Sequence, residues 1–143
     1  MMYASDKQQL FWSTYQDILE KSGNPFFISY NKHWAAVNRP TAAWNEPVIM
    51  MDFLTSHKIL RINAFLLNDV ALYKYLIDHK SEIEKSLGFV PQWVHGDKGE
   101  NTYRIKIELS YNHDSVDSYF CLIKKSLPII MKFISTFKPY IKC

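Results

Sequence analysis

Glycine and cysteine are scarce in this sequence of 143 residues, which contains four glycines and two cysteines. Four glycines leave no glycine-rich phosphate-binding loop and no nucleophile elbow, which excludes the commonest nucleotide-binding and α/β-hydrolase motifs. The cysteines, Cys121 and Cys143, have neither a metal-binding nor a redox spacing, so we expect no disulfide framework. Together these absences exclude several frequent kinds of catalytic site.

Long apolar runs are also missing. A membrane-spanning helix needs roughly 18 apolar residues, and Lys132 interrupts the longest apolar stretch near the C-terminus. Asp6 and Lys7 lie where a signal peptide would need an apolar core. The sequence therefore predicts a soluble, cytoplasmic protein that does not interact with membranes.

The five histidines are scattered, and none lies four residues from another or beside a cysteine. Zinc sites and catalytic Cys-His dyads need such groupings, so we expect no metal, no cofactor and no catalytic residue among them. They are His33, His57, His79, His95 and His113.

What the sequence does contain is typical of a globular protein with a large core. Apolar residues make up 48% and aromatic residues 15% of the chain, and the net charge is +3. The length is the commonest for one domain, so we expect residues 1–143 to form a single domain. The mild positive charge is weaker than that of a dedicated nucleic-acid-binding domain.

Three stretches predict helices. In the first, Ser5 and Gln8 form a candidate capping box, and Gly23 ends the helix. The last contains Pro128, which should kink it. The expected helices are Ser5–Ser22, Asn68–Leu87 with Asn68 as its cap, and a long C-terminal helix that begins at Asp114 or Ser115.

The expected strands are Phe26–Tyr30, Pro47–Leu54, Lys58–Leu67, Phe89–His95 and Tyr103–Leu109. The segment His33–Val37 is compatible with a further strand or with part of an aromatic-rich loop. The resulting order, α-β-β-β-α-β-β-α, predicts an α+β fold. Its sheet is antiparallel or mixed, with helices on one or both faces.

Several short motifs resemble one family, domain of unknown function 4268, and the resemblance covers nearly the whole chain. It implies membership of a family without an agreed activity, often found at the C-terminal end of nuclease-like or restriction and defence proteins. The motifs are Phe11-Trp12, Leu60-Arg61-Ile62-Asn63-Ala64-Phe65-Leu66, Ile83-Glu84-Lys85-Ser86-Leu87-Gly88 leading to Trp93, and Tyr103-Arg104-Ile105 before the long terminal helix.

The order of the first elements is also that of a PD-(D/E)XK nuclease core, in which an Asp and a Glu-x-Lys on adjacent strands hold a divalent cation. Asp52 lies near the end of a suitable strand, but its partner strand offers Arg61-Ile62-Asn63 in place of Glu-x-Lys. Such a site lacks its second carboxylate and its lysine. Asp52 is more simply explained as an acidic residue near a turn.

Two surfaces are candidates for binding. Trp34, Arg39 and Trp44 could form a recognition loop, because Trp and Arg dominate interface hot spots, although both indoles could equally anchor the loop on the core. Lysines on the C-terminal helix could contact phosphates or an acidic partner, with Arg104 on a half-exposed strand adding a further cation. For the C-terminal helix and for the strand that contains Arg104, the alternative is an ordinary solvent-exposed face. The lysines are Lys124, Lys125, Lys132, Lys138 and Lys142, and Lys106 lies beside Arg104 on the strand.

The sequence therefore favours a non-enzymatic interaction module. The family resemblance implies that this module is accessory to nucleic-acid-processing or defence systems. Its partner is an unknown protein or a nucleic acid, and a homo-oligomer is possible. The first alternative is a nucleic-acid-binding domain that uses the C-terminal lysines. The second is a divergent nuclease with a degenerate site at Asp52.

Overall fold

The computed structural model describes residues 3–23, 26–39, 48–96, 99 and 101–140. Helices and strands follow one another in the order α1 (Ala4–Ser22), β1 (Ile28–Asn31), β2 (Trp34–Val37), β3 (Val48–Leu54), β4 (Ile59–Leu67), α2 (Val70–Asp78), α3 (Lys80–Leu87), β5 (Gln92–His95), β6 (Thr102–Ser110) and α4 (Val116–Phe137).

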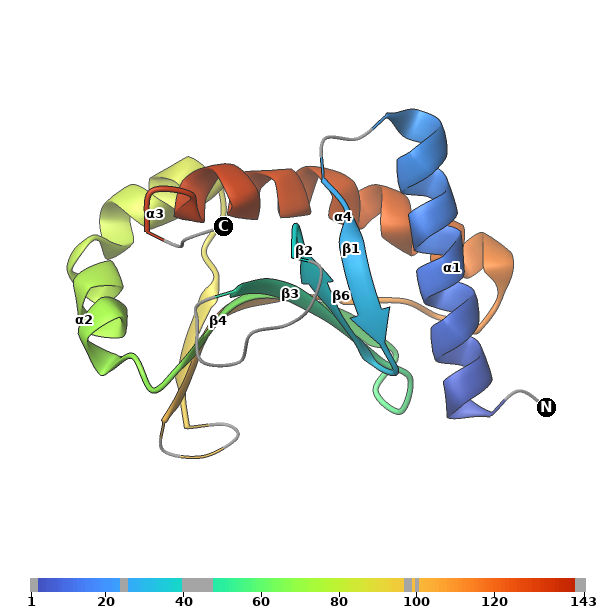
Figure 1. The fold of residues 1–143 in the computed structure, drawn as a ribbon, viewed down its shortest axis with the longest axis horizontal. Helices are drawn as coiled ribbons and strands as arrows, with labels where there is room; N and C mark the ends of the chain where they lie inside the picture. The colour runs from blue at the N-terminus through green and yellow to red at the C-terminus, as the bar shows by residue number, and fades with distance from the viewer. Residues whose placement is uncertain (1–2, 24–25, 40–47, 97–98, 100, 141–143) are drawn as a thin grey trace.

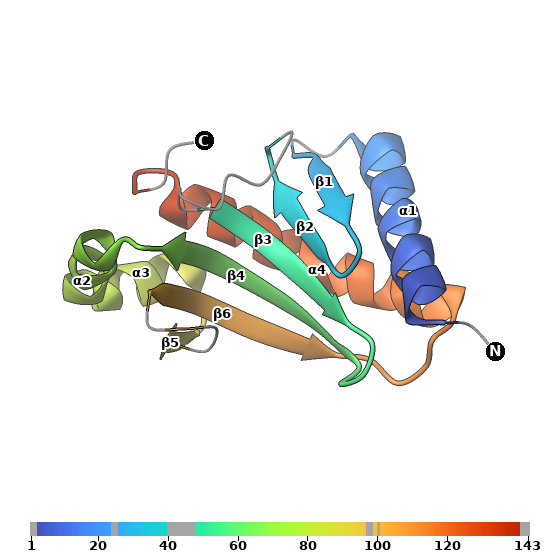
Figure 2. The ribbon, with the colours of Figure 1, turned by 60° about the horizontal axis from the view of Figure 1, so that its bottom comes forward.

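The six strands form one sheet in the order β1-β2-β3-β4-β6-β5, and every neighbouring pair is antiparallel. Helix α4 crosses one face of this sheet, and α1 lies beside α4 at the β1 end (Figure 1). Turning the molecule brings the opposite face of the sheet forward, with α4 behind the strands (Figure 2). The predicted α+β class, with a long C-terminal helix, is confirmed.

Aromatic side chains fill the space between the sheet and the helices α1 and α4. Phe11 stacks on Phe53 with ring centroids 3.9 Å apart, and both rings meet the edge of Tyr119. The hydroxyl groups of Tyr15 and Ser126 share a buried hydrogen bond of 2.7 Å, which joins α1 to α4. Because each buried ring removes a large apolar area from water, this layer explains the aromatic content of the sequence.

The predicted first helix is nearly correct, but its capping box is wrong. Tyr3 is the N-cap and makes no side-chain capping bond, so Ser5 lies inside the helix. Gly23 has a left-handed backbone with φ of 65°, as expected of a helix that ends in glycine. The following segment forms a β1–β2 hairpin in which Asn31 pairs with Trp34, so residues 34–37 are a strand.

The second predicted helix is two helices that meet at His79. Asp69, not Asn68, caps α2, because its carboxylate accepts a hydrogen bond from the Leu72 amide at 3.0 Å. Asn68 instead adopts a positive φ of 57°, which a helix N-cap does not use. Ile77, in the last turn of α2, is 39% exposed.

Helix α4 begins after Ser115, whose hydroxyl accepts a hydrogen bond from the Ser118 amide at 3.2 Å. The helix continues through Pro128 without a break. Its buried side chains run from Tyr119 to Phe137, whereas Val116 and Phe120 near its start are exposed. In the described part of the chain, no helix is both long and apolar enough to cross a membrane.

Candidate functional site

The strand register places a set of polar side chains on the face of the sheet opposite α4. Residues directly opposite each other on paired strands point to the same face. Asp52 on β3 lies opposite Arg61 on β4, and Met50 lies opposite Asn63. One strand further, Phe65 on β4 lies opposite Arg104 on β6. We call this surface the Asp52 face.

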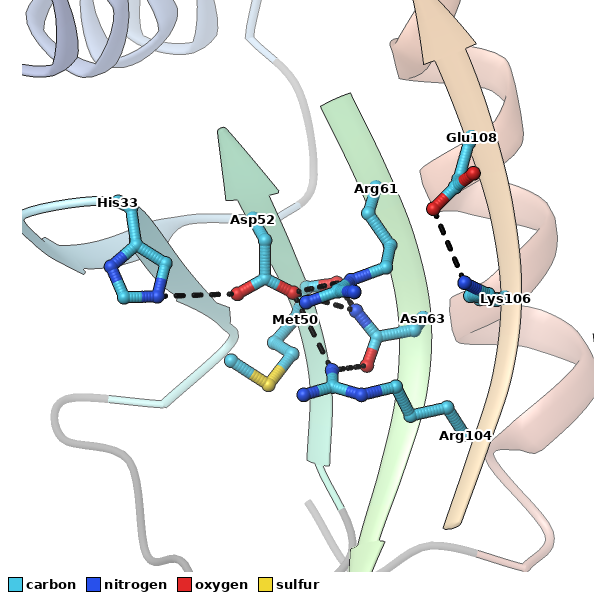
Figure 3. Close-up of polar contacts among 8 residues, drawn as sticks. All are labelled: His33, Met50, Asp52, Arg61, Asn63, Arg104, Lys106 and Glu108. Atoms are coloured by element: carbon cyan, nitrogen blue, oxygen red, sulfur yellow. Dashed lines mark hydrogen bonds and ion pairs between the residues drawn. The ribbon is translucent and has the colours of Figure 1, made fainter. Parts of the chain in front are cut away.

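Asp52 is the centre of this arrangement (Figure 3). Its Oδ2 atom accepts hydrogen bonds from Arg61 Nε at 3.0 Å and from Asn63 Nδ2 at 3.3 Å, and Arg104 Nη1 lies 3.5 Å away. Its other oxygen, Oδ1, lies 4.0 Å from Nε2 of His33, in the β1–β2 turn. The carboxylate of Asp52, on β3, is thus contacted by side chains from both β4 and β6.

Asn63 links Arg104 to Asp52 and to the backbone of β3. Its side-chain amide donates to the carbonyl oxygen of Met50 at 3.3 Å, and its Oδ1 accepts a hydrogen bond from Arg104 Nη1 at 3.0 Å. The Arg104 guanidinium also lies over the ring of Phe65, 4.6 Å from the centroid. We call Asp52, Arg61, Asn63 and Arg104 the Asp52 cluster.

The cluster is buried although it consists of polar groups. The exposed fraction is 2% for Asp52, 0% for Asn63 and 3% for Arg104. Burying ions is unfavourable unless they are paired and hydrogen-bonded, and here each charge has partners of the right kind. An apolar group flanks the cluster on the same face, comprising Trp34, Ala36, Val48, Met50, Phe65 and Leu67.

At the rim of this face lies a more exposed pair. Lys106 Nζ is 3.2 Å from Glu108 Oε2, and their side chains are 15% and 35% exposed. Both side chains come from β6, on the same face as Arg104, because alternate residues of a strand share a face. They extend the charged area beyond the buried cluster.

The geometry opposes the nuclease hypothesis for Asp52. Two guanidinium groups already occupy the oxygen at which a divalent cation would bind, and their positive charge repels such an ion. Among the described residues, no three His, Cys, Asp or Glu side chains gather as they would around a metal ion. Asp52 is also not a solvated turn residue, because it is buried within β3.

The structure brings together only part of the predicted recognition loop. Trp34 is half-buried on the Asp52 face and packs against the apolar group there. Arg39 is half-buried two residues after the end of β2. Trp44 lies outside the described residues, so the predicted pairing of two indoles is not addressed.

Arg104 and the α4 lysines do not form one surface. Arg104 was predicted to face solvent on a half-exposed strand, but it is buried in the Asp52 cluster. Lys124, Lys125 and Lys132 are exposed on α4, which lies across the other face of the sheet (Figures 1 and 2). Lys138 is also exposed, and Lys142 lies outside the described residues.

A second carboxylate, the half-buried Asp114, was expected from the sequence only as a possible helix cap. Asp114 Oδ1 accepts hydrogen bonds from the hydroxyl groups of Tyr111 and Tyr119, both at 2.8 Å. Its Oδ2 lies 2.8 Å from Lys58 Nζ and 3.1 Å from Lys7 Nζ. We call these five residues the Asp114 cluster.

The Asp114 cluster shifts the pKa of each of its acidic members. Burial alone would raise the pKa of the Asp114 carboxyl, but hydrogen bonds from Lys58, Tyr111, Tyr119 and Lys7 outweigh burial and hold it well below its usual range. Burial, and then the adjacent carboxylate, raise the pKa of Tyr111 and Tyr119 far above that of a free phenol. The resting state is therefore a carboxylate that accepts from two neutral phenols.

Comparison with known proteins adds little to this picture. No protein-family model matches the sequence, and neither does any curated protein sequence. Among solved structures, the chain is similar to YbjN from E. coli, described as a putative transcription regulator. The two are 12% identical, with a TM-score of 0.44 over 90% of this chain and 93% of that one. No specific function follows from that similarity.

Proposed function

We propose that this chain is a non-enzymatic interaction module whose Asp52 face receives a protein partner rich in acidic side chains. The observation that carries the proposal is the Asp52 cluster itself, a set of buried charges assembled from β3, β4 and β6 on the side of the sheet away from α4.

Stability alone is a poor reason for such a cluster. Replacing a buried ion pair by apolar side chains of similar volume is often neutral or stabilising by about 1–4 kcal/mol. The other face of the same strands carries only apolar side chains at the matching positions, such as Met51, Ile62 and Ile105. The charged residues on the Asp52 face therefore favour recognition over packing.

The residue types support a protein partner. Trp and Arg are enriched in protein interfaces, and this face offers the partly exposed side chains of Trp34 and Arg61. The charges of this face that reach solvent favour an acidic partner, because Arg61 and Lys106 outnumber Glu108. The resemblance to domain of unknown function 4268 would place that partner in a nuclease or defence system.

The proposal can be tested with substitutions at the rim, which leave the buried cluster intact. Tagged protein is recovered from nuclease-treated extracts of the native cells as wild type, Lys106→Glu, Glu108→Lys and Lys132→Glu. For an acidic partner we expect Lys106→Glu to lower recovery about two- to fivefold and Glu108→Lys to raise it, because rim charges act mainly through electrostatic attraction.

Lys132→Glu on α4 is the matched control and should leave recovery unchanged. Circular dichroism and thermal unfolding of each variant establish that the fold is retained. A partner lost only with Lys132→Glu, or equal recovery for all four proteins, would contradict the proposal. A partner that is recovered from untreated extracts but not from nuclease-treated ones would favour nucleic-acid binding by the α4 lysines in its place.

A further inference from the structure

A groove of about 370 Å³ lies between α2 and the end of the sheet formed by β5 and β6. Its strand residues are His95 and Tyr103, which are paired across β5 and β6 and so point to the same side. Tyr103 precedes Arg104 on β6, so its side chain lies on the opposite face from the Asp52 cluster. The groove is therefore separate from the proposed partner surface.

Three aromatic rings form one wall of the groove. The ring of His95 stacks on the ring of Tyr103, with centroids 4.5 Å apart and an angle of 13° between the two planes. The ring of Tyr73, on α2, also lies with its centroid 4.5 Å from that of Tyr103. Burial, and then the proximity of Tyr103, raise the pKa of the Tyr73 hydroxyl, so it stays a neutral donor. Such a wall favours a flat aromatic ligand, because rings gain from stacking beyond the area they bury.

Aliphatic side chains of α2 complete the apolar lining. Val70 and Ile77 both line the groove, yet they remain 48% and 39% exposed. They lie two helical turns apart on the same side of α2 as Tyr73, so together they form a continuous strip. A ligand that covered this strip would gain by removing it from water.

Two opposite charges lie on the same groove, one helical turn apart on α2. Lys74 and Asp78 both line it and are exposed, and neither takes part in an ion pair within the described part of the chain. Asp17 and Lys21, at the same spacing in reverse order, are 3.0 Å apart in α1. The Lys-before-Asp order is the less favourable one on a helix, which leaves both groups available to a ligand.

We propose that this groove binds a small zwitterionic aromatic molecule of the class of free aromatic amino acids. The ligand ring lies against Tyr73, Tyr103 and His95, its carboxylate meets Lys74, and its ammonium group meets Asp78. The cavity volume is near the lower end of the range of about 300–1,000 Å³ typical of small-molecule sites. A ligand with both charges and one ring uses every feature of the groove.

The first test compares four ligands that share the indole ring but differ in charge. Isotope-labelled protein is titrated with L-tryptophan, tryptamine, indole-3-propionate and indole, and amide shifts are followed by NMR. For a ligand of this size we expect a dissociation constant on the order of 1 mM for L-tryptophan. Tryptamine and indole-3-propionate, which each lack one charge, should bind about two- to fivefold more weakly, and indole weakest of all.

The second test assigns each charge to its residue. Lys74→Gln should weaken L-tryptophan about two- to fivefold and leave tryptamine unchanged, because tryptamine has no carboxylate. Asp78→Asn should weaken L-tryptophan and leave indole-3-propionate unchanged. Lys85→Gln, at an exposed position of α3, is the control and should alter none of the four.

Three results would overturn the proposal. The first is no saturable shift with L-tryptophan at about 10 mM, an order of magnitude above the expected dissociation constant. Equal affinity for L-tryptophan and indole is the second. The third is tighter binding of adenosine, used as a planar probe without zwitterionic charge, than of L-tryptophan. All three measurements use the unsubstituted protein, so none of these results can be attributed to a variant that fails to fold.

Discussion

The carboxylates of Asp52, which is buried, and Asp114, which is half-buried, both accept hydrogen bonds from cationic side chains, but they join different parts of the molecule. Asp114 connects α1, the β3–β4 turn, the segment after β6 and the start of α4 through Lys7, Lys58, Tyr111 and Tyr119. Asp52 connects β3 to β4 and β6, which the backbone hydrogen bonds of the sheet already join.

This difference separates a stabilising role from a binding role. The Asp114 cluster ties together segments that are far apart in sequence, so its loss removes several of the side-chain contacts that join them. The backbone amide of Tyr111 also donates to the carbonyl oxygen of Lys58 at 3.0 Å, which fixes the same junction. The Asp52 cluster adds few connections to the sheet, which is why we assign it to recognition.

The largest expected effect is that of Asp114→Ala. It removes the acceptor of two tyrosines and two lysines at a largely buried position, so we expect the free energy of unfolding to fall by about 3–5 kcal/mol. Urea unfolding followed by circular dichroism measures the change. Asp117→Ala, at an exposed position in the first turn of α4, is the control and should cost about 0.3–1 kcal/mol. Equal costs for the two substitutions would mean that the cluster does not hold the junction.

A smaller loss is expected for Asp52→Ala, about 2–3 kcal/mol in the same assay. Arg61 and Arg104 lose the carboxylate with which they pair, but the strands stay joined by the hydrogen bonds between their backbones. The substitution should also weaken partner recovery more than Asp114→Ala does in those molecules that remain folded. A cost above that of Asp114→Ala would reverse the roles that we assign to the two carboxylates.

The dependence of stability on acid pH tests the lowered pKa of Asp114 with one conservative substitution. The pKa of Asp114 is lowered in the folded state, so its stabilisation is complete above the ordinary carboxyl pKa of about 4 and is lost as the pH falls through the lower folded value. We expect urea midpoints of wild type and Asp114→Asn to differ at pH 7 and to converge as the pH falls toward 2. A constant difference between the two proteins over that interval would contradict the lowered pKa.

The tyrosines of the Asp114 cluster predict the alkaline limit. The pKa values of Tyr111 and Tyr119 are raised in the folded state, so their contribution is complete below about pH 10 and is lost as the pH rises toward the folded values. Absorbance at alkaline pH should show these phenols ionising together with unfolding, after the exposed tyrosines. Ionisation of all tyrosines near pH 10 with the fold retained would contradict the raised pKa values.

The sequence predicts the fold better than it predicts the site, for a physical reason. Strict alternation predicts correctly which side chains of β4 share a face, because the period of a strand is local. The predicted order and class are confirmed for the same reason. The boundary at His79 was missed, because the residues on both sides of it favour helix.

The Asp52 cluster depends on pairing that local patterns do not contain. Arg104 hydrogen-bonds Asn63, 41 residues earlier in the chain, through the register of β4 with β6. The alternation of Arg104, Lys106 and Glu108 is typical of a solvated strand face, so burial of Arg104 contradicts the local pattern. The sequence did contain one signal for the Asp52 cluster. Arg61 and Asn63 alternate with apolar residues on the same strand face as Phe65, which places polar and aromatic side chains together.

Replacing both members of an ion pair with apolar residues sharpens the comparison further. Asp52→Leu/Arg61→Leu should be less stable than wild type but more stable than Asp52→Ala, because apolar side chains replace one ion pair at little cost and only Arg104 is left without its carboxylate. Asp114→Leu/Lys58→Leu should stay strongly destabilised, since Lys7 and two tyrosines still lose their acceptor. Urea unfolding of single and double variants gives both coupling energies, and the first pair should at the same time lose partner recovery.

The smallest effect is expected for Lys7→Met, which removes one cation of the Asp114 cluster and keeps the apolar stem. Its side chain is 26% exposed and its contact with Asp114, at 3.1 Å, is longer than that of Lys58, so we expect a cost of about 0.5 kcal/mol in urea unfolding. Tyr119→Phe should cost more, about 1–2 kcal/mol, because its hydroxyl donates to the charged carboxylate at 2.8 Å in a buried position. If Lys7→Met cost as much as Tyr119→Phe, the ion pairs and not the phenols would hold this junction, and the contrast with the arginine-bound Asp52 would rest on chain connectivity alone.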